Sequence, residues 1–195
     1  MMRRTVLLVL GLWLIAALAV GASGILADLP VPPPAIAVGL TILVLLALRA
    51  SRSVRAGASG LGPAPLVAFH LVRIAAGAYF LILNDRGVLP GEFAIAAGWG
   101  DIAVGVAAVP VLFWCLPLRT RRQRMGLALW NAAGLVDILG VLGNGLRLFL
   151  VTPAIAQPFT SLPLALLPTF LVPLVIASHV LLFGWAFRRE PGPRR

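Results

Sequence analysis

Residues 130–150, WNAAGLVDILGVLGNGLRLFL, decide how this sequence folds. The stretch is apolar, and it has the roughly 20 residues that a helix needs to cross a bilayer. Yet it contains Asn131, Asp137 and Asn144, with Arg147 near its end. A carboxylate at the centre of a lipid-facing helix costs about 2.5–3.5 kcal/mol. Asp137 is therefore expected to face other parts of the protein and not lipid.

The rest of the chain repeats this apolar character. It has 195 residues, of which 61% are hydrophobic, well above the 45–50% typical of soluble domains. Backbone groups in lipid must bond within their own segment, so the apolar segments are expected to be helices. The sequence thus predicts an all-α, polytopic transmembrane bundle forming a single domain over residues 1–195, with no soluble domain. The six expected helices cover about residues 5–22, 34–49, 64–83, 92–117, 125–150 and 162–187.

Basic residues indicate the orientation of the bundle. All 16 are Arg, and they concentrate at both ends of the chain and in the gaps after the second and fourth segments. Cytoplasmic loops carry such an excess, so both termini are expected in the cytoplasm of a bacterial cell, with the helices in its cytoplasmic (inner) membrane. Residues 1–22 also resemble a secretory signal, with Val20-Gly21-Ala22 as a cleavage site; cleavage would leave five helices.

The net charge of +10 does not indicate a nucleic-acid partner. A nucleic-acid-binding domain gathers its basic residues on one face, whereas these lie in short gaps between apolar runs. The expected partners are the lipid bilayer and either a second copy of the chain or a larger membrane complex. The single cysteine, Cys115, lies in an apolar run and is expected to be a packed, inert thiol.

Polar residues inside the helices are the candidate site. Counting 1.5 Å per residue from the helix ends places them between the cytoplasmic third and the midplane. We expect Arg73 to pair with Asp101 or Asp137, and one proton on a histidine or an Asp to balance the surplus carboxylate. Both Asp residues lie among glycines expected to permit close helix contact, Gly98, Gly100 and Gly105 and then Gly134, Gly140 and Gly143. The predicted buried polar cluster comprises His70, Arg73, Asp101, Asn131, Asp137 and His179.

Other polar and aromatic residues receive structural interpretations. Asn131 and Asn144 are expected to form hydrogen bonds between helices. The five tryptophans, Trp130 among them, lie mostly near the expected helix ends, where aromatic belts form. Pro110, Pro168 and Pro173 are expected to kink their helices.

Four functions fit this sequence. The first is a small-solute or proton-linked transporter whose cavity the cluster lines. The second is an accessory or assembly subunit in which the cluster is structural. The third is a membrane protein that binds haem b or a metal through His70 and His179. The fourth is an enzyme acting on a lipid or quinone; no HExxH or GxSxG motif supports it, so no catalytic residue, metal site or cofactor is predicted.

Overall fold

The computed structural model describes residues 2–187, and this part of the chain is helical, without strands. It contains six helices that are long and apolar enough to cross a membrane. The prediction of an all-helical protein with six such helices is therefore confirmed. The six are Arg4–Ser23, Pro33–Ala50, Pro63–Asp85, Gly91–Cys115, Arg121–Val151 and Leu167–Ala186.

Several of these spans are built from shorter elements. Two contain π-helical turns, and one is interrupted near its middle. In chain order the elements are α1 (Met2–Ser23), α2 (Ile25–Asp28), α3 (Pro33–Ala50), α4 (Arg52–Ser59), α5 (Pro63–Phe69), α6 (Val72–Asp85), α7 (Gly91–Pro110), the π-helix η1 (Val111–Cys115), α8 (Arg121–Val151), the 3₁₀-helix η2 (Pro153–Thr160), the π-helix η3 (Leu167–Leu171) and α9 (Val172–Ala186).

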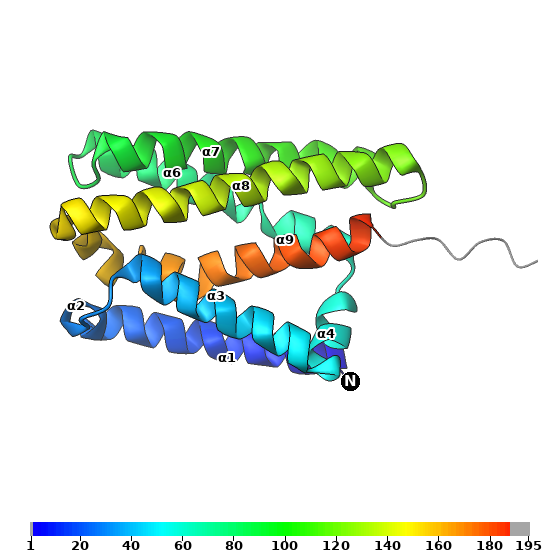
Figure 1. Cartoon of the computed structure of the whole chain (residues 1–195), viewed down its shortest axis with the longest axis horizontal. Coiled ribbons are helices and arrows are strands. Elements are labelled where there is room, and N and C mark those ends of the chain that lie inside the picture. The colour runs from blue at the N-terminus through cyan, green and yellow to red at the C-terminus, as the bar shows by residue number, and fades with distance from the viewer. Residues whose placement is uncertain (1, 188–195) are drawn as a thin grey trace, which may run out of the picture.

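The long helices run side by side in one bundle (Figure 1). α7 packs against α6 and α8, α8 packs against α9, and α9 packs against α3. α1 lies at the edge of the bundle, where only 11% of its apolar window is buried, compared with 61% for the last span. The polar site described below therefore belongs to the inner helices, α6 to α9.

The connections divide between the two ends of the bundle (Figure 1). The start of α1, α4 and the α7–α8 connection lie at one end. The α2 turn, the α6–α7 connection and η2 lie at the other. Arg52 and Arg55 of α4 and the arginines of residues 119–124 are consequently at the same end.

The third span is not the continuous helix expected over 64–83. It is interrupted at His70 and Leu71, where the amides of His70, Leu71, Arg73 and Ile74 each donate to the carbonyl three residues earlier. Such tight 3₁₀ bonding in mid-helix changes the direction of the following side chains. Neither His70 nor Leu71 is a Gly or Pro, so no local residue type signals the break.

Three other boundaries differ from expectation. The gap between the second and third expected helices contains α4, which Ser51 caps by accepting from the Val54 amide at 3.3 Å. α8 begins at Arg121 and not near 125, because Thr120 and Gln123 form a capping box. The last expected helix began near 162, but residues 162–165 form turns and the last span begins at Leu167.

Two of the expected proline kinks coincide with π-helical turns. η1 follows Pro110 directly, and η3 contains Pro168 in its first turn. A proline cannot donate an amide hydrogen to the preceding turn, so local widening of the helix is a physical consequence of its position.

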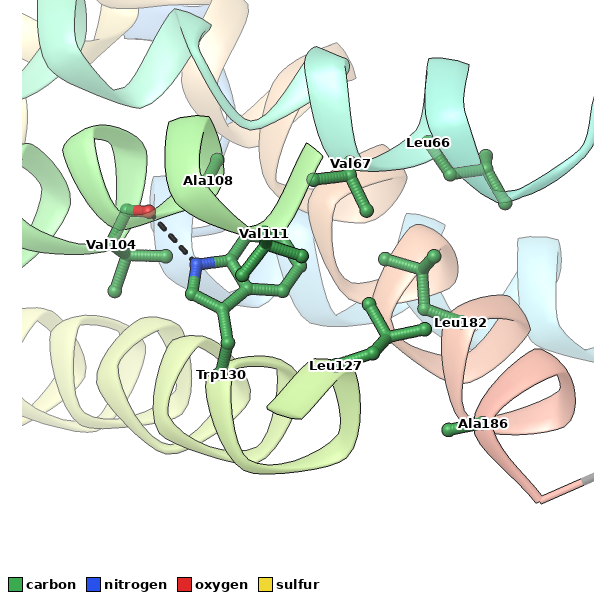
Figure 2. Close-up of a cluster of buried hydrophobic side chains, with 9 residues drawn as sticks. All are labelled: Leu66, Val67, Val104, Ala108, Val111, Leu127, Trp130, Leu182 and Ala186. Carbon is green, nitrogen blue, oxygen red and sulfur yellow. Dashed lines mark hydrogen bonds between the residues drawn. The ribbon is translucent and has the colours of Figure 1, made fainter. Parts of the chain in front are cut away.

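Apolar packing fixes the inner helices around the site. One buried cluster joins α5, α7, α8 and α9, with Trp130 at its centre donating from Nε1 to the Val104 carbonyl at 3.0 Å (Figure 2). Gly77 lets α6 approach α7, because a Cβ there would overlap the Gly98 carbonyl oxygen. The packing role expected of Gly140 and Gly143 is wrong: nothing lies within 4 Å of a Cβ at either position.

Candidate functional site

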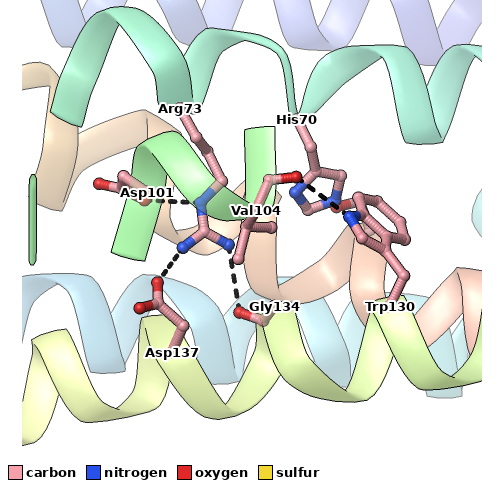
Figure 3. A network of polar contacts seen from close by, with 8 residues as sticks. His70, Arg73, Asp101, Val104, Trp130, Gly134 and Asp137 are labelled. Atoms are coloured by element: carbon pink, nitrogen blue, oxygen red, sulfur yellow. Dashed lines mark hydrogen bonds and ion pairs between the residues drawn. The ribbon is translucent and has the colours of Figure 1, made fainter. Parts of the chain in front are cut away.

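Arg73 on α6 joins three helices at the centre of the bundle (Figure 3). Its Nε donates to Oδ1 of Asp101 on α7 at 2.6 Å, and its Nη2 donates to Oδ2 of Asp137 on α8. Its Nη1 donates to the carbonyl of Gly134, also on α8, at 3.1 Å. The whole residue is only 2% exposed. All three guanidinium nitrogens are therefore engaged with neighbouring helices.

The two carboxylates leave this group with surplus negative charge. When both are ionised, Asp101, Asp137 and Arg73 sum to −1. The second Asp101 oxygen points away from Arg73 in Figure 3, and no described residue donates to it. The Asp137 side chain is 21% exposed, whereas that of Asp101 is 6% exposed. A net charge buried this deeply is costly without a counter-ion or a bound proton.

His70, at the break between α5 and α6, is fully buried and bonds to Ser178 of α9. The Ser178 hydroxyl donates its one hydrogen to the Val175 carbonyl at 2.7 Å. It must then accept from Nε2 of His70, 2.9 Å away. This assigns the neutral ring its hydrogen at Nε2 and leaves Nδ1 a bare acceptor, for which no partner exists among the described residues.

His179 on α9 is held by Asn131 of α8 in the same manner. The Asn131 amide nitrogen donates to the His179 carbonyl at 2.9 Å, which orients the amide. Its oxygen then faces Nδ1 of His179 at 2.8 Å and can only accept. The neutral ring accordingly carries its hydrogen on Nδ1, and Nε2 is a second buried acceptor with no partner in the described chain.

The two imidazoles are in contact with each other. Their ring centroids are 4.3 Å apart with a 45° angle between the planes, and Trp130 packs edge-on against His70 at 5.1 Å. Two charged rings so close would repel, so the pair can accept one proton but not two. Rings in mutual contact leave no space for a porphyrin between them, which the haem interpretation of His70 and His179 requires. Among the described residues, no group of three potential metal ligands is present.

An apolar pocket borders the ion network at Asp101. Its volume is about 70 Å³. Among the described residues that line it, Asp101 is the one that carries a charge. Four phenylalanines contribute to the walls. The other lining residues come from the start of α3 and from α8, η2, η3 and α9. The carboxylate thus lies between the pocket and Arg73.

The structure brings all six residues of the predicted cluster together. Arg73, Asp101 and Asp137 form the ion network, whereas Asn131 and His179 form a bonded pair. His70 connects to them through its ring contact with His179. Asn144 lies elsewhere: it donates to the Glu92 carbonyl at 2.9 Å, so both asparagines do bond between helices.

Sequence reasoning missed three contributors to this site. Ser178 fixes the His70 ring, the Gly134 carbonyl accepts from Arg73, and Trp130 packs on His70. Placing Trp130 in an interfacial belt was wrong, because it is 92% buried at mid-bundle. Ser178 directly precedes His179 on a helix, which was a usable signal; a backbone carbonyl leaves none in a sequence.

These features define a helical protein with six apolar spans and a buried ion network among the inner four. The chain belongs to the family that shares the domain of unknown function DUF8737, which matches residues 31–187. The matched range includes every residue of the network and begins after α1. Comparison with curated proteins and with solved structures gave no significant match.

Proposed function

We propose that this is a multi-pass protein of the bacterial cytoplasmic membrane with both termini in the cytoplasm. Six long apolar helices support insertion. The gathering of α4 and the α7–α8 connection at one end of the bundle supports the orientation, since both are rich in Arg. The apolar outer surface contacts lipid, and a second copy or a larger complex covers part of it.

The first helix is part of the working protein in this proposal. Trp13 donates from Nε1 to the Thr169 carbonyl at 2.9 Å, at the π-helical turn where regular helix bonding is interrupted. Intact-mass measurement of the purified protein checks this: we expect the full chain. A mass for the chain beginning at residue 23 would identify residues 1–22 as a cleaved signal.

Within the membrane, the ion network and the histidine pair bind and release one proton in a small-solute transporter. The observation that carries this proposal is the combination of a surplus carboxylate with two acceptor nitrogens. Arg73 neutralises only one of its two Asp partners, and His70 and His179 each present a bare ring nitrogen. A proton on an Asp or on the histidine pair brings the whole cluster to neutrality.

A purely structural cluster would not require those bare nitrogens. Leaving a buried polar group unsatisfied costs about 1–3 kcal/mol, and hydrogen bonds to Ser178 and Asn131 hold both rings in this state. An unsatisfied buried group that destabilises the fold is retained where it serves a function. Ionisable groups inside membranes often form proton relays.

A structural role is the second candidate, and one observation favours it. Each Arg73 guanidinium nitrogen donates to a different acceptor, so the residue fastens α6, α7 and α8 together. An accessory or assembly subunit could use such a clamp without any proton. The two functions differ in what acidification does to the protein.

Counting the protons that the protein binds distinguishes the proton-binding transporter from the structural clamp. Purified protein in weakly buffered detergent is titrated between about pH 5.5 and 9 with an indicator dye, a range in which exposed carboxylates near pKa 4 take up almost none. We expect wild type to bind close to one proton more than Asp101→Asn, because removing that charge makes the network neutral. The control is Asp85→Asn, which removes an exposed carboxylate and should match wild type. Equal uptake by all three proteins would support the clamp.

A further inference from the structure

The pocket beside Asp101 has the composition of a binding site for a small organic cation. Its walls include the rings of Phe80, Phe93, Phe149 and Phe159. Aromatic faces attract cations, with a strength that increases when the cation is removed from water. Asp101 also lines the pocket, and its second oxygen accepts no hydrogen bond from the described chain.

The charge of the site excludes an anion. Arg73 lies behind Asp101, and each of its three nitrogens already donates within the network. What the network offers the pocket is therefore its surplus negative charge. A neutral apolar molecule would leave that charge unbalanced, whereas an ammonium ion would balance it.

The size of the pocket limits the ligand. The cavity volume is about 70 Å³, and one water molecule needs about 10–15 Å³ of such volume. The space consequently suits roughly five non-hydrogen atoms, the size of a short alkylammonium ion. Its apolar walls favour a carbon tail over a second polar group.

A surface depression shares lining residues with the pocket, and we expect a ligand to enter through it. It lies between the α2–α3 connection and η2, has a volume of about 320 Å³, and shares Pro33, Phe149 and Ala156 with the pocket. A ligand could pass from the end of the bundle that carries α2, through this depression, to the Asp101 carboxylate. Pro33, Phe149 and Ala156 line both spaces and so lie at the boundary between them.

We propose that this pocket binds a small alkylammonium ion, whose charged end meets the free Asp101 oxygen and whose tail lies among the phenylalanines. The inference rests on the proposed function and names its substrate class. Cation and proton neutralise the same surplus charge, so each displaces the other. That competition would couple movement of the amine to movement of a proton in the opposite direction.

The test compares two probes of equal size. n-Butylammonium and 1-butanol each have five non-hydrogen atoms and share a carbon chain, but only the first is charged. Binding to protein in detergent is measured by saturation-transfer NMR with a concentration series. We expect wild type to bind butylammonium at least about tenfold more tightly than butanol, and acidification to weaken only the former.

Variants locate the binding site. Asp101→Asn should lose the preference for butylammonium, and Asp85→Asn should keep it. Gly145→Leu changes the pocket at a position outside the ion network of Arg73, Asp101 and Asp137. A Cβ at Gly145 is 3.4 Å from the Phe93 ring, so the larger side chain fills the pocket without touching Arg73. It should weaken both probes. Equal binding of the two probes, or unchanged preference in Asp101→Asn, would overturn the inference.

Failure of the butylammonium site can be distinguished from failure of the proposed proton site. One proton counted without butylammonium binding would refute the ligand class and leave the proton site intact. Butylammonium binding with no difference in proton uptake between wild type and Asp101→Asn would refute the proton site.

Discussion

Asn131 holds His179 at two points, donating to its backbone carbonyl at 2.9 Å and facing its ring Nδ1 at 2.8 Å. The first bond orients the amide, and the second then assigns the hydrogen of the neutral ring to Nδ1. One side chain on α8 thus sets both the position of α9 and the chemical state of its histidine. The free Nε2 beside Gly134 and His70 is a direct result.

Replacing Asn131 should release that tautomer. In wild type, ¹⁵N NMR of labelled histidine should show His179 with its hydrogen on Nδ1 and His70 with its hydrogen on Nε2. In Asn131→Leu, His179 loses its acceptor and should show a mixture of both tautomers, while His70 keeps its Ser178 partner. Asn144→Leu removes a half-buried amide elsewhere on α8 and should change neither ring. Identical histidine spectra in wild type and Asn131→Leu would show that the amide does not set the tautomer.

Removing Arg73 should be more damaging than removing one of its partners. Arg73→Met leaves two carboxylates unpaired in the bundle, and breaking such a buried pair costs about 3–5 kcal/mol. Adding Asp101→Asn returns the network to the wild-type charge of −1 and should recover part of the loss. Unfolding in mixed micelles of increasing denaturing detergent measures the four free energies of the cycle. Strict additivity of the two single changes would mean that the ion pair contributes no coupling.

Two glycines of α8 provide a matched pair for testing the packing at the histidine. A Cβ at Gly134 would lie 2.7 Å from Cε1 of His179 and 3.0 Å from the Val104 side chain, whereas nothing lies within 4 Å of a Cβ at Gly140. Gly134→Ala should therefore cost about 1–3 kcal/mol in overpacking and move the His179 ring signals. Gly140→Ala should be neutral or stabilising by up to about 1 kcal/mol. Equal effects on unfolding would contradict the close contact between α8 and His179.

Trp13 contributes to the attachment of α1 through a hydrogen bond to η3. Trp13→Phe keeps an aromatic ring against Phe170, 5.2 Å away between centroids, but removes the hydrogen bond to Thr169. We expect a loss of about 1 kcal/mol in unfolding free energy. Trp114→Phe is the control, because that side chain is 76% exposed and should have almost no effect. Matching losses in the two variants would argue against a specific link between α1 and η3.

The number of apolar helices could be predicted from the sequence, because the length of an apolar segment is a property of that segment alone. The cluster of six polar residues was likewise predictable, since burial costs in lipid force such groups toward one another. The pairing partners could not be predicted. Whether Arg73 meets Asp101, Asp137 or both depends on helix rotation and on the break at His70, which no local residue marks. Gly140 and Gly143 misled because a glycine permits close packing without requiring it. The capping box at Thr120 was readable but was overlooked.

Infrared difference spectroscopy of the protein in lipid can detect the proton that we propose the buried network carries. A protonated carboxyl group has a carbonyl stretch that the ionised form lacks, and groups in the loops lose that band well before neutral pH. At neutral pH we expect one of two results. The first is a carboxyl band that is absent in Asp101→Asn or Asp137→Asn and kept in Asp85→Asn. The second is a charged imidazole band that is absent in His70→Ala and His179→Ala. Spectra with neither band, indistinguishable among wild type and these variants, would show that the network holds no proton and that Arg73, Asp101 and Asp137 serve only to fasten the helices.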